Sequence, residues 1–186
     1  MTIGSLAVFV GGALAVRRPG VTDAEFRCFQ AVNGLSHRGY HAIWLPMQLG
    51  SLGGPLAVGA ALATRGERRL GARAAAVGAF AWVAAKAVKP AVRRGRPAVA
   101  VATARVLGQE QGGLGYPSGH AAVSAATAAV VVPHLPRRWR RPAWGLALAV
   151  GPMRTYVGAH LPLDVVGGIA LGTAIGTAAR SVTRRG

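Results

Sequence analysis

Three short stretches of the sequence carry ionisable residues whose types and spacing could do chemistry. They read KPAVRRGRP, YPSGH and RTYVGAHLPLD, and their residues of interest are Lys89 and Arg96, His120, and Arg154, His160 and Asp164. Phosphoryl transfer needs positive charge around the phosphate, a nucleophile and a proton donor. Two histidines, one carboxylate and three cations form a complete set for that reaction.

Residue type suggests how such a set would work. The cations would hold the equatorial oxygens of the phosphate, and backbone amides near Ser118 and Gly119, at the start of an expected helix, would add donors. One histidine can attack phosphorus while the other protonates the leaving oxygen. Asp164, four residues after His160, can orient an imidazole by accepting from its second nitrogen. Pro162 indicates that His160 lies just before the helix.

Each stretch also has a simpler explanation when it is taken alone. The basic residues Lys89, Arg93, Arg94 and Arg96 could extend to lipid headgroups, as long cationic side chains often do. Ser118 could be only a helix cap, with His120 a polar residue at a helix start. These explanations weaken together, because three independent coincidences would have to fall on one face of the molecule.

A metal site is the alternative ligand chemistry. His120, His160 and Asp164 could ligate zinc or iron. Three cations beside the same side chains would oppose a metal ion and favour an anion, so we expect no metal and no other cofactor. The remaining histidines are expected to be background: His37, His41 and His134.

The composition indicates a membrane protein. Hydrophobic residues make up 52% of the 186, the mean hydropathy is +0.36, and 22 Lys and Arg against 5 Asp and Glu give a net charge of +17. Apolar runs separated by basic residues are typical of a chain in contact with anionic lipid, whereas nucleic-acid binding usually interleaves basic residues with aromatics on a polar face. We expect a bilayer with anionic lipids as partner, and no nucleic acid. A lone cysteine, Cys28, permits no internal disulfide.

The apolar segments predict an all-α fold, a polytopic membrane helix bundle of about six transmembrane helices in one domain, residues 1–186. The clearest span is 42–64, whose 23 residues carry no charge and are long enough to cross a hydrocarbon core of roughly 30 Å. The other expected spans are 2–16, 71–88, 118–132, 142–157 and 161–180. If the spans alternate across the bilayer, the three chemically active stretches share one face.

Two further patterns concern packing and the membrane surface. Residues 23–35 predict an interfacial amphipathic helix, with Phe26 and Phe29 on the apolar side and Glu25 available to face headgroups. A series of glycines four residues apart occupies one helix face, where a neighbouring backbone can come close. These glycines are Gly168, Gly172 and Gly176.

The three stretches resemble the signature of the type 2 phosphatidic acid phosphatase superfamily, which also includes the vanadium haloperoxidases. That signature runs Lys, six residues, Arg-Pro; then Pro-Ser-Gly-His; then Ser-Arg, five residues, His, three residues, Asp. The sequence matches it in order and spacing between Lys89 and Asp164, and departs from it at Met153, which stands in place of the serine. Losing that hydroxyl removes one support for the phosphate and leaves the catalytic groups in place.

The resemblance implies a helical fold with the site between helix ends, and it implies roles. His160 would form a phosphohistidine, His120 would be the acid for the leaving group and then the base for water, and Asp164 would orient His160. The phosphate would be bound by Lys89, Arg96, Ser118, Gly119 and Arg154, without a metal. The implied activity is that of an integral membrane lipid phosphatase. Its substrate would be a phosphate or diphosphate of an isoprenoid, of the undecaprenyl or decaprenyl type, or of a glycerolipid.

Two other functions fit the same residues. A lipid phosphotransferase would use the same site and pass the phosphoryl group to another alcohol. A non-enzymatic basic membrane protein would bind anionic lipid, or partner helices through its glycines. In either phosphoryl-transfer case, the groove between spans and the loop over 98–114 would set which lipid is bound.

The expected location is the cell membrane, with several passes and an extracytoplasmic active site. The connections away from the three stretches carry Arg65, Arg68, Arg69 and Arg73, then Arg137, Arg138, Arg140 and Arg141, and finally Arg180, Arg184 and Arg185. These 11 residues equal the 11 Lys and Arg on the side of the three stretches, but Lys89, Arg96 and Arg154 have a proposed role there, which leaves eight for the comparison. The excess favours a cytoplasmic location for the connections away from the site, and therefore an extracytoplasmic site.

Overall fold

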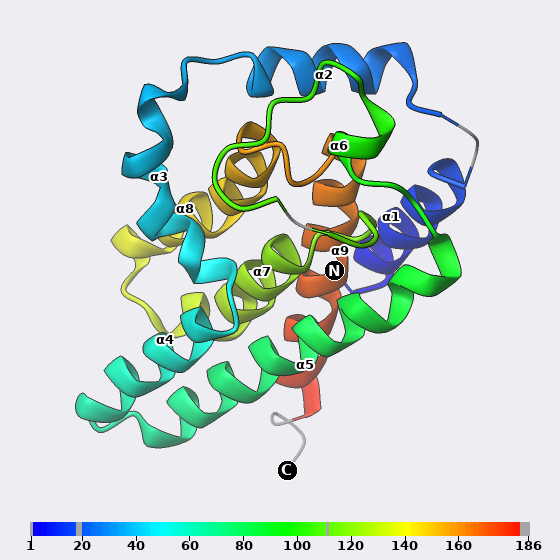
Figure 1. The fold of residues 1–186 in the computed structure, drawn as a ribbon. Coiled ribbons are helices and arrows are strands. Elements are labelled where there is room, and N and C mark those ends of the chain that lie inside the picture. Colours follow the sequence, from blue (N-terminus) through cyan, green and yellow to red (C-terminus); the bar gives the residue numbers. More distant parts are fainter. Residues whose placement is uncertain (1, 18–19, 111, 183–186) are drawn as a thin grey trace.

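The computed structural model describes residues 2–17, 20–110 and 112–182, and every regular element in this part of the chain is a helix. The elements are α1 (Thr2–Ala15), α2 (Asp23–Asn33), η1 (His37–Gly39), α3 (Tyr40–Met47), η2 (Gln48–Gly50), α4 (Gly53–Thr64), α5 (Arg68–Val92), α6 (Pro97–Ala100), α7 (Gly119–Val131), η3 (Val132–His134), α8 (Arg137–Tyr156) and α9 (Pro162–Val182). The predicted all-α class is thus confirmed for the described residues. The longer helices form a bundle, and α2 and α6 lie across one end of it (Figure 1).

The central helix of the bundle is α7, which packs against α9, α5, α8 and α4. Every residue of α7 from Ala121 to Val130 is buried, and most of them are alanines. Because these side chains are small, neighbouring helix backbones can lie close to α7. The helix that carries His120 near its start is therefore enclosed on all sides.

The contact between α7 and α9 depends on the glycines spaced four residues apart. A Cβ atom on Gly172 would lie 2.1 Å from the carbonyl oxygen of Ala122, and one on Gly168 would lie 2.3 Å from that of Ser118. The third glycine of the series meets α7 in the same way. No carbon atom fits at such distances, so the predicted close approach at this face is confirmed, and the partner is α7.

The prediction of one continuous helix over 42–64 is wrong. The chain forms α3, passes through η2 and an extended residue, Ser51, and continues as α4. Pro46 and a cluster of glycines weaken the helix here. Packing supplies the reason for the break, because a Cβ atom on Gly50 would lie 2.5 Å from the carbonyl oxygen of His120. Breaking the helix brings the backbone of η2 directly against the start of α7.

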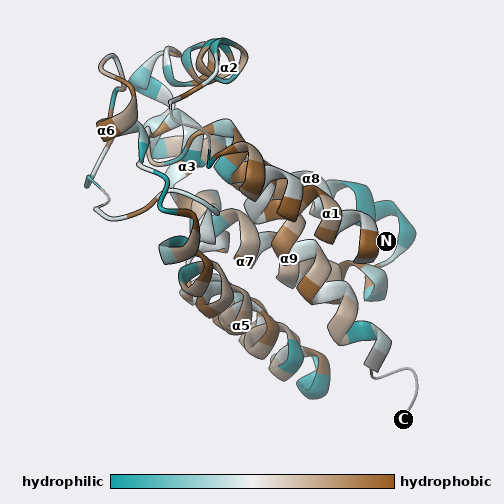
Figure 2. Cartoon of the chain, turned by 90° about the vertical axis from the view of Figure 1, so that its right-hand side faces the viewer, coloured by the Kyte–Doolittle hydropathy of each residue, from teal (hydrophilic) through white to brown (hydrophobic). Residues whose placement is uncertain are grey.

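The expected count of about six transmembrane helices is not confirmed. Two helical segments are long and apolar enough to cross a bilayer by length and composition, Arg68–Ala100 and Pro162–Ser181. Ile3–Ala15 and Gly53–Thr64 are apolar but shorter. The 12 residues of α4 and the 13 of α7 extend about 20 Å, less than a hydrocarbon core of roughly 30 Å. Figure 2 shows pale and brown residues along the bundle and teal at the far end of α5.

The amphipathic helix predicted over 23–35 is present as α2, and Phe29 on its apolar side is fully buried. Glu25, however, does not face headgroups, and that prediction is wrong. Its side chain is buried and pairs with Arg94. The reason is geometric: Glu25 lies one helical turn before Phe29, so both point to the inner face of a helix that covers the end of the bundle.

The bundle brings the three chemically active stretches to this same end. Here α5 and α8 end, and α7 and α9 begin. Lys89 lies in the last turn of α5 and Arg154 in the last turn of α8. Ser118 caps α7 with its hydroxyl, and Asp164 lies in the first turn of α9. The chain direction of four helices therefore concentrates the site at one end.

Candidate active site

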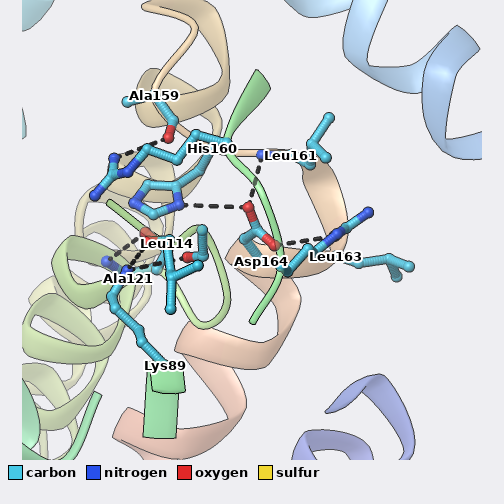
Figure 3. A network of polar contacts seen from close by, with 12 residues as sticks. Lys89, Leu114, Ala121, Ala159, His160, Leu161, Leu163 and Asp164 are labelled. Atoms are coloured by element: carbon cyan, nitrogen blue, oxygen red, sulfur yellow. Dashed lines mark hydrogen bonds and ion pairs between the residues drawn. The ribbon is translucent and has the colours of Figure 1, made fainter. Parts of the chain in front are cut away.

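His160 and Asp164 form the centre of the site. Nδ1 of His160 lies 3.4 Å from Oδ2 of Asp164, and both side chains are almost completely buried. The same Oδ2 accepts a hydrogen bond of 3.0 Å from the backbone N–H of Leu161, the residue before the first turn of α9. Figure 3 shows one edge of the imidazole turned to Asp164, with Lys89 reaching up from below the ring. Asp164 is thus fixed by the start of its own helix and faces one nitrogen of His160.

Burial determines the protonation of His160. Removal from water is the largest influence and lowers the pKa of His160 to about 4, although the nearby carboxylate of Asp164 acts in the opposite direction. The imidazole is therefore neutral at physiological pH. With the proton on the nitrogen that faces Asp164, the other ring nitrogen keeps a free electron pair and can act as a nucleophile.

A buried ion-pair chain supports Asp164 from the other side. One guanidinium nitrogen of Arg94 donates to Oδ1 of Asp164 at 2.9 Å, and another donates to Oε2 of Glu25 at 2.5 Å. Oε1 of Glu25 accepts from the backbone N–H of Leu163 in α9. All three charged side chains are at most 6% exposed. Arg94 therefore holds Asp164 in place while Glu25 holds Arg94.

Neither Arg94 nor Glu25 belongs to the predicted site. From the sequence, Arg94 is expected to extend to lipid headgroups with its basic neighbours, and Glu25 is expected to face headgroups. One signal was available, because Glu25 is one of five acidic residues among 22 basic ones and lies one turn from a phenylalanine. A rare carboxylate on an apolar face indicates a buried partner.

The three predicted cations lie near the two histidines. Nζ of Lys89 donates to the carbonyl oxygens of Leu114 and Gly115, at 2.5 and 3.2 Å. One guanidinium nitrogen of Arg96 donates to the carbonyl oxygen of Ala159 at 3.1 Å. Arg154, 5% exposed, has a guanidinium nitrogen 3.6 Å from the sulfur of Met47. Backbone carbonyls and packing hold these side chains in place.

Unsatisfied hydrogen-bond donors gather at this point. Among the described residues, the buried side-chain nitrogens without a hydrogen bond are Nε of Arg96, Nε of Arg154 and Nδ1 of His160. Buried polar groups in proteins are nearly always hydrogen-bonded, and an unpaired one needs an explanation. Donors on two fixed guanidinium groups beside one imidazole suit an anion with several acceptor oxygens, such as phosphate.

The start of α7 adds further donors. The hydroxyl of Ser118 accepts from the backbone N–H of Ala121 at 3.5 Å, so Ser118 is the cap that the simpler explanation expected. The backbone N–H of Ser118 itself donates to the backbone carbonyl oxygen of Asp164. No heavy atom lies within 4 Å of the Cβ position on Gly119. An anion can therefore approach the N-terminus of α7, where the helix dipole favours negative charge.

His120 reaches the site from a different direction. It lies in the first turn of α7 and is half-buried. His120 and Arg154 line a cavity of about 270 Å³ that extends away from Asp164 toward α3. The two histidines thus come from different segments of the chain, and the one at the cavity has room beside it for a second reactant.

Two other residues from the sequence analysis, Met153 and His134, lie outside this group of charged side chains. Met153, which replaces the serine of the signature, packs in an apolar cluster with Met47, Tyr156 and Val157. His134 contacts the carbonyl oxygen of Val130 at the opposite end of α7, away from the site. Among the described residues, no group of three or more His, Cys, Asp or Glu side chains could hold a metal ion.

The sequence and the fold both match known proteins. The family model described as the PAP2 superfamily matches residues 70–185, which include all three stretches. No curated protein matches the sequence. The structure of the first transmembrane PAP2 type phosphatidylglycerolphosphate phosphatase from Bacillus subtilis is similar with a TM-score of 0.76 at 22% identity, over 99% of this chain and 96% of that chain. Aquifex aeolicus LpxE is similar with a TM-score of 0.77 at 19% identity, over 88% of this chain and 98% of that chain. At these identities the two structures share the fold.

Proposed function

Because this chain belongs to the PAP2 superfamily, we propose that it is an integral membrane phosphatase that hydrolyses the phosphate or diphosphate monoester of an isoprenoid or a glycerolipid. One observation carries the proposal: Nε of Arg96 and Nε of Arg154 are buried donors without a hydrogen-bond partner. They belong to the same site as the His160–Asp164 pair. The structural similarity to a phosphatidylglycerolphosphate phosphatase covers 99% of this chain and 96% of that chain, and it supports a lipid substrate.

The first step would transfer the phosphoryl group to the enzyme. His160 holds its Nδ1 proton toward Asp164 and attacks phosphorus with Nε2. The new P–N bond forms as the P–O bond to the leaving alcohol or phosphate breaks. His120 donates its proton to the leaving oxygen. The products of this step are a phosphohistidine at His160, a neutral His120 and the dephosphorylated lipid.

The second step would release phosphate. Neutral His120 accepts a proton from water while the water oxygen attacks phosphorus, and the P–N bond breaks. His160 recovers its electron pair and inorganic phosphate leaves with His120 protonated again. Charge spread over three equatorial oxygens would be met by Lys89, Arg96 and Arg154, with the backbone amide of Gly119 at the start of α7 adding a donor. The backbone amide of Ser118 already donates to the carbonyl oxygen of Asp164. These residues supply a nucleophile, an acid and an electrophilic site, so the proposal includes no metal.

The experiment that tests this function is phosphate release by the purified full chain in detergent with EDTA. We expect hydrolysis of lipid phosphates to persist in EDTA, and His160→Ala to lower kcat by at least about a thousandfold, because a covalent nucleophile is lost. The matched control is His134→Ala, which removes a histidine at the other end of α7. Activity that EDTA abolishes would overturn the metal-free mechanism, and full activity in His160→Ala would overturn the nucleophile.

A further inference from the structure

The cavity beside His120 is lined in part by residues that lie outside the three stretches. It measures about 270 Å³, and its polar lining includes Tyr40, Trp44, Gln48 and Gln109 in addition to His120 and Arg154. Tyr40 and Trp44 come from α3, Gln48 from the break that follows it, and Gln109 from the loop before α7. Three separate segments thus build one polar pocket against the site.

The position of this cavity matches the place of the leaving group. In an in-line displacement the leaving oxygen lies opposite the attacking nitrogen. With His160 attacking and His120 donating the proton, the group attached to the leaving oxygen extends from His120. His120 borders the cavity, whereas neither His160 nor Asp164 is part of its lining.

The lining is chemically selective. Among the described residues around the cavity, none is acidic, and Arg154 is the one cation. That cation also faces the reacting phosphate. The two glutamine amides each offer donors and an acceptor, and the tyrosine hydroxyl offers both, which suits alcohol groups. A second phosphate in this position would bring additional negative charge without an additional cation to balance it.

Size and surroundings support a headgroup in the cavity with the hydrocarbon outside it. Pockets for drug-sized ligands measure roughly 300–1,000 Å³, so about 270 Å³ suits a small headgroup. An adjacent groove of about 550 Å³ shares Gln48 and is lined by Leu45, Pro46, Leu49 and Leu146. A lipid with its headgroup in the cavity can pass its chain through this apolar groove to the bilayer.

We propose that the cavity of Tyr40, Gln48 and Gln109 binds an uncharged, hydroxyl-bearing unit attached directly to the reacting phosphate, so that the preferred substrate is a phosphate monoester of a glycerol or sugar unit on a lipid. Diphosphates, in which a second phosphate would occupy the cavity, are poorer substrates. This inference rests on the proposed function, because it assigns the leaving group to the side of His120.

The test compares substrates and variants in detergent. Wild-type protein receives phosphatidylglycerophosphate, phosphatidate, a polyprenyl diphosphate and phenyl phosphate. We expect the highest kcat/KM for phosphatidylglycerophosphate. Gln48→Leu combined with Gln109→Leu is expected to lower the ratio of kcat/KM for this lipid to that for phosphatidate about tenfold, since hydrogen bonds to the hydroxyl are lost. The matched control is Gln30→Leu on α2, outside the cavity.

A single substitution serves as a second variant. Gln109→Leu alone, on an exposed loop residue, provides a variant that keeps the bundle intact if the double variant does not fold. A higher kcat/KM for the diphosphate, or an unchanged ratio in both variants, would overturn the headgroup assignment and leave the phosphatase function standing. Phosphate release from none of the four substrates would overturn the proposed function and the headgroup assignment together.

Discussion

The carboxylate of Asp164 is held by hydrogen bonds from Arg94 and from the backbone N–H of Leu161, and it faces the imidazole of His160 at 3.4 Å. If Asp164 orients His160 for attack, then Arg94 acts on the reaction through Asp164 without touching the substrate. Arg94 and its partner Glu25 are therefore positioning residues.

Two adjacent arginines allow this role to be tested. Arg94→Met is expected to lower kcat about 100-fold with little change in KM, because small errors in the placement of a nucleophile have effects of that size. Arg93→Met is the matched control, since Arg93 is exposed at the end of α5 and its side chain contacts only the carbonyl of Pro90 among the described bonds. Steady-state kinetics on detergent-solubilised protein measures both. Equal effects of the two substitutions would contradict the role, and Glu25→Gln, with a smaller loss of kcat, provides a milder variant should Arg94→Met fail to fold.

The two histidines have separable roles that a substrate with a good leaving group would distinguish. The first step on p-nitrophenyl phosphate needs little help from an acid, whereas attack by water still needs a base. In His120→Ala we therefore expect a phosphoenzyme to accumulate, with the acid lability and base stability of a phosphohistidine. It is measured with radiolabelled substrate after quenching in alkali. A phosphoenzyme in His160→Ala would contradict the assignment of the nucleophile.

At the scale of elements, the contact of α7 with α9 determines where the two histidines meet. Gly172 lies so close to α7 that a Cβ atom would fall 2.1 Å from a carbonyl oxygen. His120 starts one of these helices and His160 directly precedes the other. A shift between the helices would therefore separate the acid from the nucleophile.

We expect Gly172→Leu to lower stability by about 3 kcal/mol, at the upper end of the range for overpacking, and the apparent Tm by about 6–12 °C. Ala178→Leu on an exposed position of the same helix is the control and should leave both nearly unchanged. Thermal unfolding in detergent measures both the stability and the apparent Tm. A Gly172→Leu variant with wild-type Tm would contradict this prediction, because it would show that α7 and α9 can move apart without a loss of stability.

At the scale of the whole molecule, the helix directions place charge at the end opposite the site. α5 and α8 run toward the site and α9 runs away from it, so the starts of α5 and α8 and the end of α9 lie at the far end. Those positions carry basic residues, among them Arg68, Arg69, Arg137 and Arg180. Arg184 and Arg185, which are expected on the same side, lie outside the described residues.

This distribution predicts membrane orientation. By the positive-inside rule we predict that the far end is cytoplasmic and the site extracytoplasmic. Two reporters fused after Gly186 test this orientation. We expect a reporter that works only in the cytoplasm to be active, and a reporter that works only after export to be inactive. Replacing Arg137, Arg138, Arg140 and Arg141 by glutamine should weaken this preference, since these are the basic residues at the start of α8. A reporter found outside the cell would reverse the orientation.

The sequence by itself determined the chemical groups. The spacing from Lys89 to Arg96 and from His160 to Asp164 is local, and it identifies residues without any knowledge of packing. Hydrophobic periodicity likewise predicted an all-α chain and the start of a helix at Ser118, because caps and apolar runs are properties of neighbouring residues.

Tertiary structure decided which groups meet across the chain. The pairing of Glu25 with Arg94 joins residues 69 positions apart, and it exists because α2 lies across the end of the bundle. The break in the helix expected over 42–64 arises because Gly50 meets the backbone of His120, a contact that no local pattern encodes. The same break supplies Gln48 to the cavity beside the site. Local spacing thus gives the reacting groups, whereas burial and long-range packing fix their support and the shape of the space that a substrate must fit.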